Sequence, residues 1–281
     1  MVSHAEARVS NALIRGCLAV AIVAFSQRAR GDEPAKPAEV ASPPRYETFL
    51  VIPLRVHILS ADELPDVDCK LRDEDATRIL GKVNGIWNKA GIHWGLDALV
   101  REPAAEAARF KRAHELDGPR NLGLYKLLVP DSSRAGVGMH VYYIHKFAVN
   151  GVWLGGGTAF VQETARLRPV EGGIDEPVPR VTSHELGHAL GLPHRENRTN
   201  LLASGTTGTT LNTAEIEMAR AKARTIEGVK TVADFKTEAE AAEASGDRAR
   251  ARAVWTWLGQ IPDCGDAPKE ALARLDEKTG R

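Results

Sequence analysis

Three histidines and a glutamate in the run 184–194 have the spacing of a metal site. His184 and His188 are four residues apart, so on a helix both rings project from one face, about one turn apart. Glu185 directly follows the first histidine, where it does not join the same ligand set but can reach a water held by the ion. Its predicted role is that of a general base. These residues therefore predict metal-assisted hydrolysis.

A third histidine follows a predicted break in the helix. Gly191 comes three residues after His188, where a left-handed residue can end the helix, and Pro193 prevents the helix from resuming. His194 can then return to the metal as a third neutral nitrogen ligand, which leaves one open position for water. We predict one catalytic Zn²⁺ held by His184, His188 and His194. The alternative, a helix whose histidines are only packed or solvated, leaves the glutamate and the breaking glycine unexplained.

The run from His184 to His194 matches the HExxHxxGxxH pattern and resembles that of the metzincin zinc peptidases. The resemblance implies a zinc-dependent endopeptidase that acts on a peptide or protein substrate. His184, His188 and His194 would be the zinc ligands and Glu185 the catalytic base. It also implies an α+β fold, in which a twisted mixed sheet packs on helices and the zinc-site helix forms the floor of the cleft. The likeness extends loosely over residues 46–224.

The chain departs from the family pattern at three places. Metzincins carry a methionine in a tight turn beneath the metal, and the spacing places Leu202 there. Leucine fills a similar apolar volume, so we expect a working site with slightly altered packing. Arg195, after the third histidine, matches no subfamily marker, and no tyrosine follows Tyr143. The overall likeness is therefore greatest to matrix-type or uncharacterised bacterial members.

The rest of the chain supplies elements for such a fold. Alternating β-branched and apolar residues predict strands, and apolar residues at helical spacing with acidic starts and glycine ends predict helices. Pro53 argues for an edge or an irregular start of the first strand. Residues 150–160 are the best candidate for an edge strand that pairs with substrate, the alternative being an ordinary glycine-rich hairpin. The expected strands are 49–59, 92–99, 127–129, 139–147 and 150–161, and the expected helices are 73–89 and 104–116.

Beyond residue 225 the composition shifts to Ala, Glu, Lys and Arg, which predicts a helical C-terminal extension, 226–281. Helices are expected at 232–244 and 248–258, followed by a short one at 268–277. One such hairpin cannot form a solenoid, so it is expected to pack on the catalytic domain, 46–225. The alternative function is a zinc-containing, non-catalytic binding protein that recruits a partner through this extension.

The N-terminal residues predict export. Arg8 and Arg15 precede an apolar run that is too short to span a bilayer, so residues 1–31 resemble a signal peptide and 32–45 a linker or short pro-segment. We therefore expect a secreted or periplasmic protein without a stable membrane anchor. Cys69 and Cys264 would remain, either bridged or as two free thiols.

The charge balance carries one further expectation. Lys plus Arg and Asp plus Glu number 37 each, which gives no indication of a nucleic acid partner. Composition gives no indication of the oligomeric state.

Overall fold

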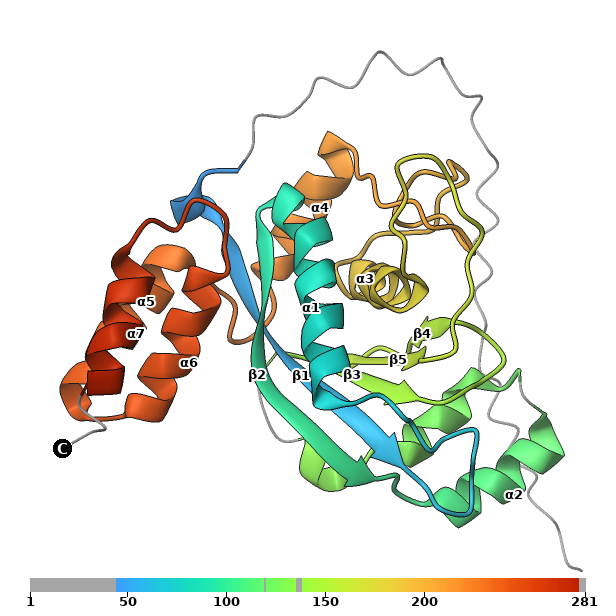
Figure 1. Cartoon of the computed structure of the whole chain (residues 1–281). Coiled ribbons are helices and arrows are strands. Elements are labelled where there is room, and N and C mark those ends of the chain that lie inside the picture. The colour runs from blue at the N-terminus through green and yellow to red at the C-terminus, as the bar shows by residue number, and fades with distance from the viewer. Residues whose placement is uncertain (1–43, 119, 135–137, 278–281) are drawn as a thin grey trace, which may run out of the picture. The chain divides into compact units, whose positions relative to one another are not determined.

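The computed structural model describes residues 44–118, 120–134 and 138–277. The expected signal peptide and nearly all of the expected linker lie outside these residues. The described chain forms a sheet in the order β2-β1-β3-β5-β4, in which β1, β2, β3 and β5 are parallel and β4 is antiparallel to β5 (Figure 1). A short β6 pairs with the start of β1. The strands are β1 (Leu50–Ser60), β2 (Ile92–Pro103), β3 (Met139–Ile144), β4 (Gly151–Trp153), β5 (Thr158–Gln162) and β6 (Lys230–Thr231).

Strand β1 lies inside the sheet, between β2 and β3. Of the two alternatives for Pro53, the edge strand is therefore wrong and the irregular start is confirmed. Pro53 falls in a gap in the pairing, because β6 pairs with Leu50 and Val51 whereas β3 begins to pair at Leu54. The register with β2 also shifts between Leu54 and Arg55. A residue without an N–H group is tolerated at such an irregularity.

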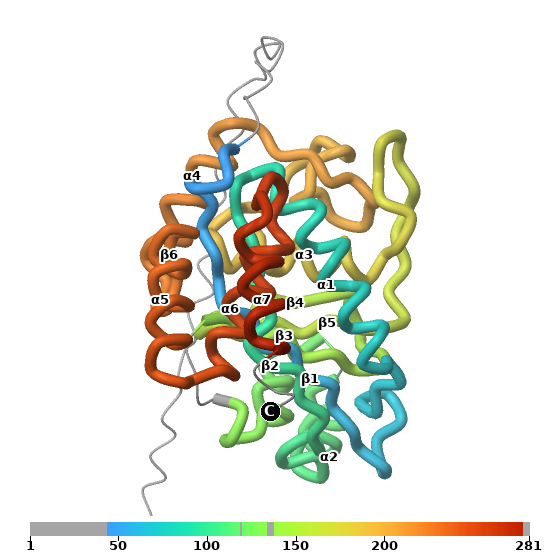
Figure 2. The backbone as a smooth tube through the Cα atoms, turned by 60° about the vertical axis from the view of Figure 1, so that its left-hand side comes forward, coloured from blue at the N-terminus to red at the C-terminus, as the bar shows by residue number. Residues whose placement is uncertain are grey.

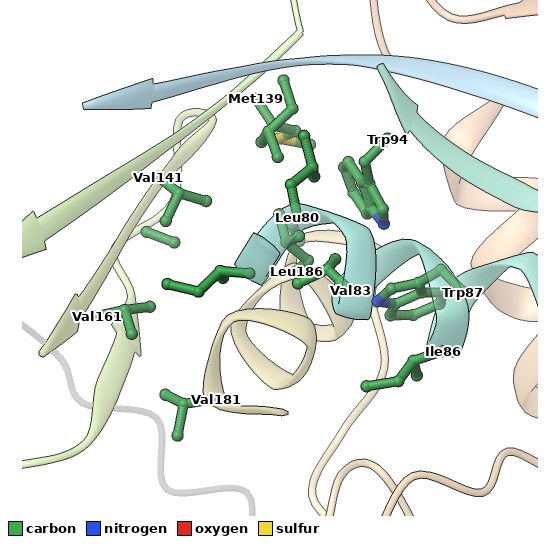
Figure 3. Close-up of a cluster of buried hydrophobic side chains, with 14 of the residues drawn as sticks. Leu80, Val83, Ile86, Trp87, Trp94, Met139, Val141, Val161, Val181 and Leu186 are labelled. Atoms are coloured by element: carbon green, nitrogen blue, oxygen red, sulfur yellow. The ribbon is translucent and has the colours of Figure 1, made fainter. Parts of the chain in front are cut away.

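One face of the sheet is covered by two helices, α1 (Asp73–Trp87) and α3 (Pro177–Ala189). Figure 3 shows apolar side chains of α1 and α3 beside those of β2, β3 and β5. Trp87 of α1 packs edge-on against Trp94 of β2, and the Asn84 side chain bonds the main chain of Trp94 in both directions. The predicted end of α1 is confirmed, since Gly91 is left-handed after a 3₁₀ turn, η2 (Asn88–Ala90). This layer fixes α3, which carries the histidine motif.

The opposite face is covered in part by three helices, α5 (Val232–Ser245), α6 (Arg248–Gly259) and α7 (Ala267–Glu277), so the predicted C-terminal helices are confirmed (Figure 2). They pack on Phe49 and Val51, whose side chains alternate with those that face α1 and α3. Trp257 lies against Gly95 of β2, where a Cβ would be 2.6 Å from the indole, and its Nε1 donates to the Leu96 carbonyl at 2.9 Å. The extension is therefore docked on the sheet.

The remaining elements differ more from expectation. Residues 127–129 are not a strand, because 122–128 form a 3₁₀ helix, η3, whose Tyr125 packs among Phe110, Phe147 and Phe160. Residues 150–161 form the hairpin β4–β5 rather than a single strand. Helix α2 starts three residues later than expected. The other elements are η1 (Tyr46–Thr48), α2 (Ala107–Asp117), η4 (Asp131–Arg134) and α4 (Thr213–Ala223).

Both described cysteines are free thiols. Cys69 is buried and its Sγ donates to Glu163 at 3.4 Å, whereas the Sγ of Cys264 lies 3.6 Å from the Gly259 carbonyl. The bridged alternative is therefore not the arrangement of the structure. Within the described part of the chain, no helix combines the length and apolar character that a bilayer crossing requires.

Candidate metal centre

Helix α3 presents His184 and His188 on one face and ends directly after them. Gly191, with φ +80°, donates to the His188 carbonyl at 3.0 Å, and Leu192 N–H reaches back to the Gly187 carbonyl at 3.0 Å. This pair of bonds is a Schellman cap, which requires a left-handed residue at the Gly191 position. Pro193 follows, and the chain returns His194 to the helix. The predicted helix end is thus confirmed in detail.

The three histidines lie together as one cluster. Nε2 of His188 is 3.1 Å from Nε2 of His184 and 3.1 Å from Nε2 of His194. Nitrogens bound to one tetrahedral zinc at roughly 2.0–2.1 Å would be about 3.3–3.4 Å apart. One ligand atom from each of the three histidines lies within 4.8 Å of the other two. Among the described residues, no other group of three or more His, Cys, Asp or Glu side chains comes as close together. The cluster therefore has the size of a single metal site.

The partners of the Nδ1 atoms show which nitrogens face the centre of the cluster. Nδ1 of His184 lies 2.9 Å from the Leu201 carbonyl, and Nδ1 of His188 lies 2.8 Å from the Leu192 carbonyl. A carbonyl only accepts, so Nδ1 of His188 carries the proton, and the Leu201 carbonyl favours the same tautomer of His184; each Nε2 then has a lone pair. Two lone pairs 3.1 Å apart cannot hydrogen-bond to each other. The arrangement fits a bound cation, because carbonyl partners commonly orient metal-binding histidines in this way.

Burial keeps the rings of His184 and His188 neutral, as ligands must be. Burial, together with the nearby charges of Arg180 and the other two histidines, lowers the pKa of His184 to about 3. Burial also lowers the pKa of His188. His194 is exposed at the mouth of the cluster. His184 and His188 are therefore available as neutral imidazoles at neutral pH.

Arg180 lies one turn before His184 on α3, and its side chain is fully buried. Its guanidinium donates to three main-chain carbonyls, those of Gly208 (3.0 Å), Asn200 (3.2 Å) and Ala203 (2.6 Å). Nη1 also lies 3.0 Å from Nδ1 of His184. A guanidinium only donates, so Arg180 competes with the Leu201 carbonyl for Nδ1 of His184, and its charge disfavours protonation of that ring. Arg180 ties the segment 200–208 to the helix.

Leu202 occupies the place expected for it beneath the cluster. Its side chain is fully buried, and a Cβ at Gly187 would lie 3.1 Å from Leu202 Cδ1. Gly187 stands between the two helical histidines, so Leu202 packs directly under the motif. The described geometry shows an apolar floor without a methionine.

Glu185 lies in the same cleft, against the edge of the sheet. It is 5% exposed, and burial raises the pKa of its carboxyl to about 8. The main-chain N–H of Trp153 and the charge of Arg180 lower this pKa, but burial is the larger effect. A Cβ at Gly151 would lie 2.8 Å from Glu185 Oε1. The glycine therefore allows β4 to approach the carboxylate.

Strand β4 ends the order of strands and borders the cleft. Asn150 and Leu154 bond to β5, so the alternating main-chain groups of Gly151 and Trp153 face away from β5. The cleft has a volume of about 780 Å³ and is lined by this strand, by all three histidines, by Glu185 and by apolar side chains that include Leu167 and Val181. The expected edge strand thus lies beside the predicted site residues.

Two residues of this region were missed by the sequence reasoning. Arg180 carried a signal, since it lies one helical turn before His184 on the same face. Glu215 was not singled out from the sequence, and its side chain proves to be buried behind Arg195. Its capping contact with Asn212 is local, but its bonds to Arg195 and Asn200 join separate segments that no local pattern connects.

No protein-family model matches the sequence, and no curated protein matches it. Among solved structures, one described as a chaperone–substrate complex aligns with 63% of this chain and 35% of its own, at 11% identity and a TM-score of 0.39. The chain spans about a third of the length of that protein. A zinc-dependent peptidase from Methanocorpusculum labreanum aligns with 60% of this chain and 99% of its own, at 13% identity and a TM-score of 0.27.

Proposed function

We propose that the chain is a secreted zinc-dependent endopeptidase of the metzincin kind. The observation that supports this most is the orientation of His184 and His188. Their Nδ1 atoms contact main-chain carbonyls, and their Nε2 atoms face the centre of the cluster that they form with His194. Secretion is proposed from the sequence of residues 1–31 alone.

His184, His188 and His194 would hold the zinc ion. When bound, zinc would supply a Lewis acid that polarises the peptide carbonyl and lowers the pKa of the attacking water. Its positive charge would also counter the effect of burial on the pKa of Glu185, so that the carboxylate is available as a base. Glu185 would take the proton of the attacking water on a carboxylate oxygen and pass it to the leaving amine nitrogen.

The substrate would bind as an extended strand along the outer side of β4. The main-chain groups of Gly151 and the carbonyl of Trp153 face that side, whereas the N–H of Trp153 bonds Glu185, and pairing through the main chain accepts many sequences. The side chains that line the cleft around β4 and α3 are mostly apolar, which favours substrates with apolar residues beside the cleaved bond.

The experiment compares wild type with Glu185→Gln in the mature chain. Metal content by mass spectrometry and cleavage of a labelled unfolded protein are measured on both, with Glu238→Gln on α5 as a carboxylate control remote from the cleft. We expect about one zinc per chain in all three and chelator-sensitive cleavage in wild type and the control. Loss of the general base lowers kcat by about a hundredfold to ten-thousandfold.

Two results would count against the proposal. Zinc without cleavage in wild type would favour the non-catalytic binding protein with a recruiting helical extension. Absence of zinc from wild type would remove the basis of the proposal altogether.

A further inference from the structure

Arg195, the residue after the third histidine, is held by a buried carboxylate. Its Nε donates to Glu215 Oε1 at 2.5 Å, and Glu215 reaches it from the first turn of α4. The Glu215 side chain is only 1% exposed, whereas that of Arg195 is 37% exposed. The pair is therefore anchored at the glutamate end.

The other oxygen of Glu215 is occupied as well. Oε2 accepts from Asn200 Nδ2 at 2.8 Å and from the main-chain N–H of Asn212 at 2.9 Å. Asn200 in turn accepts from Leu202 N–H at 2.7 Å through its Oδ1. Glu215 thus joins the segment of the third histidine, the turn that carries Leu202 and the start of α4.

His194 needs such support more than the other two histidines. His184 and His188 are placed by a packed helix, but His194 follows the helix end and is exposed. A ligand on a loop loses conformational entropy when it binds, and that loss weakens binding unless the loop is already held. The main chain of Arg195 contributes one bond of its own, from its N–H to the Leu202 carbonyl at 3.1 Å.

We propose that Glu215 is a positioning residue that holds Arg195 and so keeps His194 in place for the metal. The inference rests on the proposed zinc site but not on peptide cleavage. A carboxylate suits this role because it only accepts, and all three of its neighbours are donors. The amide of a glutamine in its place would turn an N–H₂ group toward Arg195 or toward Asn200 and Asn212.

The test is the zinc affinity of the mature chain, measured by competition with a chromogenic chelator at a temperature well below unfolding. Wild type is compared with Glu215→Gln, Arg195→Gln and the double variant. We expect each single variant to weaken zinc binding by about tenfold to a hundredfold, the range typical of residues that orient metal ligands. The double variant should be little weaker than either single variant, because both remove one shared interaction.

Asn212→Ala separates positioning from stability. It removes the side-chain cap of α4, the bond from Glu215 N–H to Asn212 Oδ1, but leaves the main-chain bond to the Glu215 carboxylate intact. We expect it to lower the melting temperature by a few degrees and to leave zinc affinity within about threefold of wild type. Glu238→Gln serves as the remote carboxylate control.

The inference is overturned if Glu215→Gln binds zinc within twofold of wild type, or if Asn212→Ala weakens zinc as much as Glu215→Gln. If wild type binds zinc but cleaves nothing, the proposed function fails and the affinities still decide the role of Glu215. If wild type binds no zinc, both the proposed function and the positioning role of Glu215 are wrong.

Discussion

Gly151 of the edge strand touches Glu185 of the histidine motif. A Cβ built at Gly151 would lie 2.5 Å from Val181 Cγ1 and 2.8 Å from Glu185 Oε1. The edge strand and the proposed base are therefore in direct contact, and any side chain at position 151 must displace one of them. Under the proposed function, this contact would couple the pairing of substrate with β4 to the placement of the base.

Gly151→Ala should consequently impair cleavage without loss of zinc. A displacement of about 1 Å in a catalytic group lowers kcat/KM by as much as about a hundredfold. The measurement is kcat/KM together with zinc content. Gly81→Ala on α1 is the matched control, because a Cβ there meets nothing within 4 Å. An unchanged kcat/KM in Gly151→Ala would show that the contact has no part in catalysis.

Leu202 offers a direct test of the apolar floor beneath the histidines. Leu202→Met restores the methionine of the resembled family, and such exchanges usually change stability by less than about 1.5 kcal/mol. Leu202→Ala leaves a cavity under Gly187 and should cost about 2–5 kcal/mol. Urea unfolding of the three proteins measures these differences. Equal stability of Leu202→Ala and wild type would contradict the packing described here.

Trp257 tests whether the helical extension is part of the folded unit. Its side chain is 2% exposed and covers Gly95, so Trp257→Ala should cost about 3–5 kcal/mol. We expect one unfolding transition in wild type and a lower midpoint in the variant. Calorimetry would contradict this if the extension melted in a separate transition and the main transition stayed in place.

We expect the buried His93 to make the free energy of unfolding fall in mild acid. Burial lowers the pKa of His93 to about 4, and a hydrogen bond with Gln260 opposes this shift. In the unfolded chain the pKa of this histidine has its ordinary value. Between pH 6.5 and 4 the unfolded state binds the extra proton, so stability falls as the pH falls and is constant above this window. The slope is at most about 1.4 kcal/mol per pH unit.

The measurement is urea unfolding from pH 7.5 to 4.5 with chelator present, for wild type and His93→Gln. The comparison is between slopes, because the substitution also changes stability at every pH. Wild type should show the steeper dependence below pH 6.5, since the other histidines with lowered pKa values contribute equally to both proteins: His57, His140, His184 and His188. Parallel curves would rule out His93 as a contributor.

The thiols give a simple probe of the cysteine arrangement. Burial raises the pKa of the Cys69 thiol above its ordinary value, which suppresses the reactive thiolate. In the mature chain, Cys264 should react with a disulfide reagent within minutes, whereas Cys69 should react only on unfolding. A chain without free thiols would indicate the bridge that the structure lacks.

Much of this molecule could be predicted locally. The acidic start of α1 and its left-handed Gly91, the histidine motif with its breaking Gly191, and the Asn212 cap of α4 each depend on neighbouring residues. The metal cluster is likewise contained in one short run. Elements of this kind are specified by propensity, capping and periodicity, which a single sequence displays.

The parts that were mistaken or missed depend on distant contacts. Pro53 is accommodated inside the sheet because β6 and β3 leave a gap beside it, and residues 127 and 128 end a 3₁₀ helix where a strand was expected. Glu215 is buried because Arg195 and Asn200 meet it there. None of these partners is indicated by the sequence near the residue concerned.

The docking of α5, α6 and α7 on the start of β1 also bears on how the chain matures. Phe49 and Val51 come early in the described chain, and the helices that cover them come last. Chains are synthesised from the N-terminus, so Phe49 and Val51 remain uncovered until those helices have been made. The histidine motif is made well before that point. A chain cut short by interrupted synthesis would therefore carry the complete histidine motif on a sheet whose apolar residues Phe49 and Val51 are uncovered, and it would be prone to aggregate.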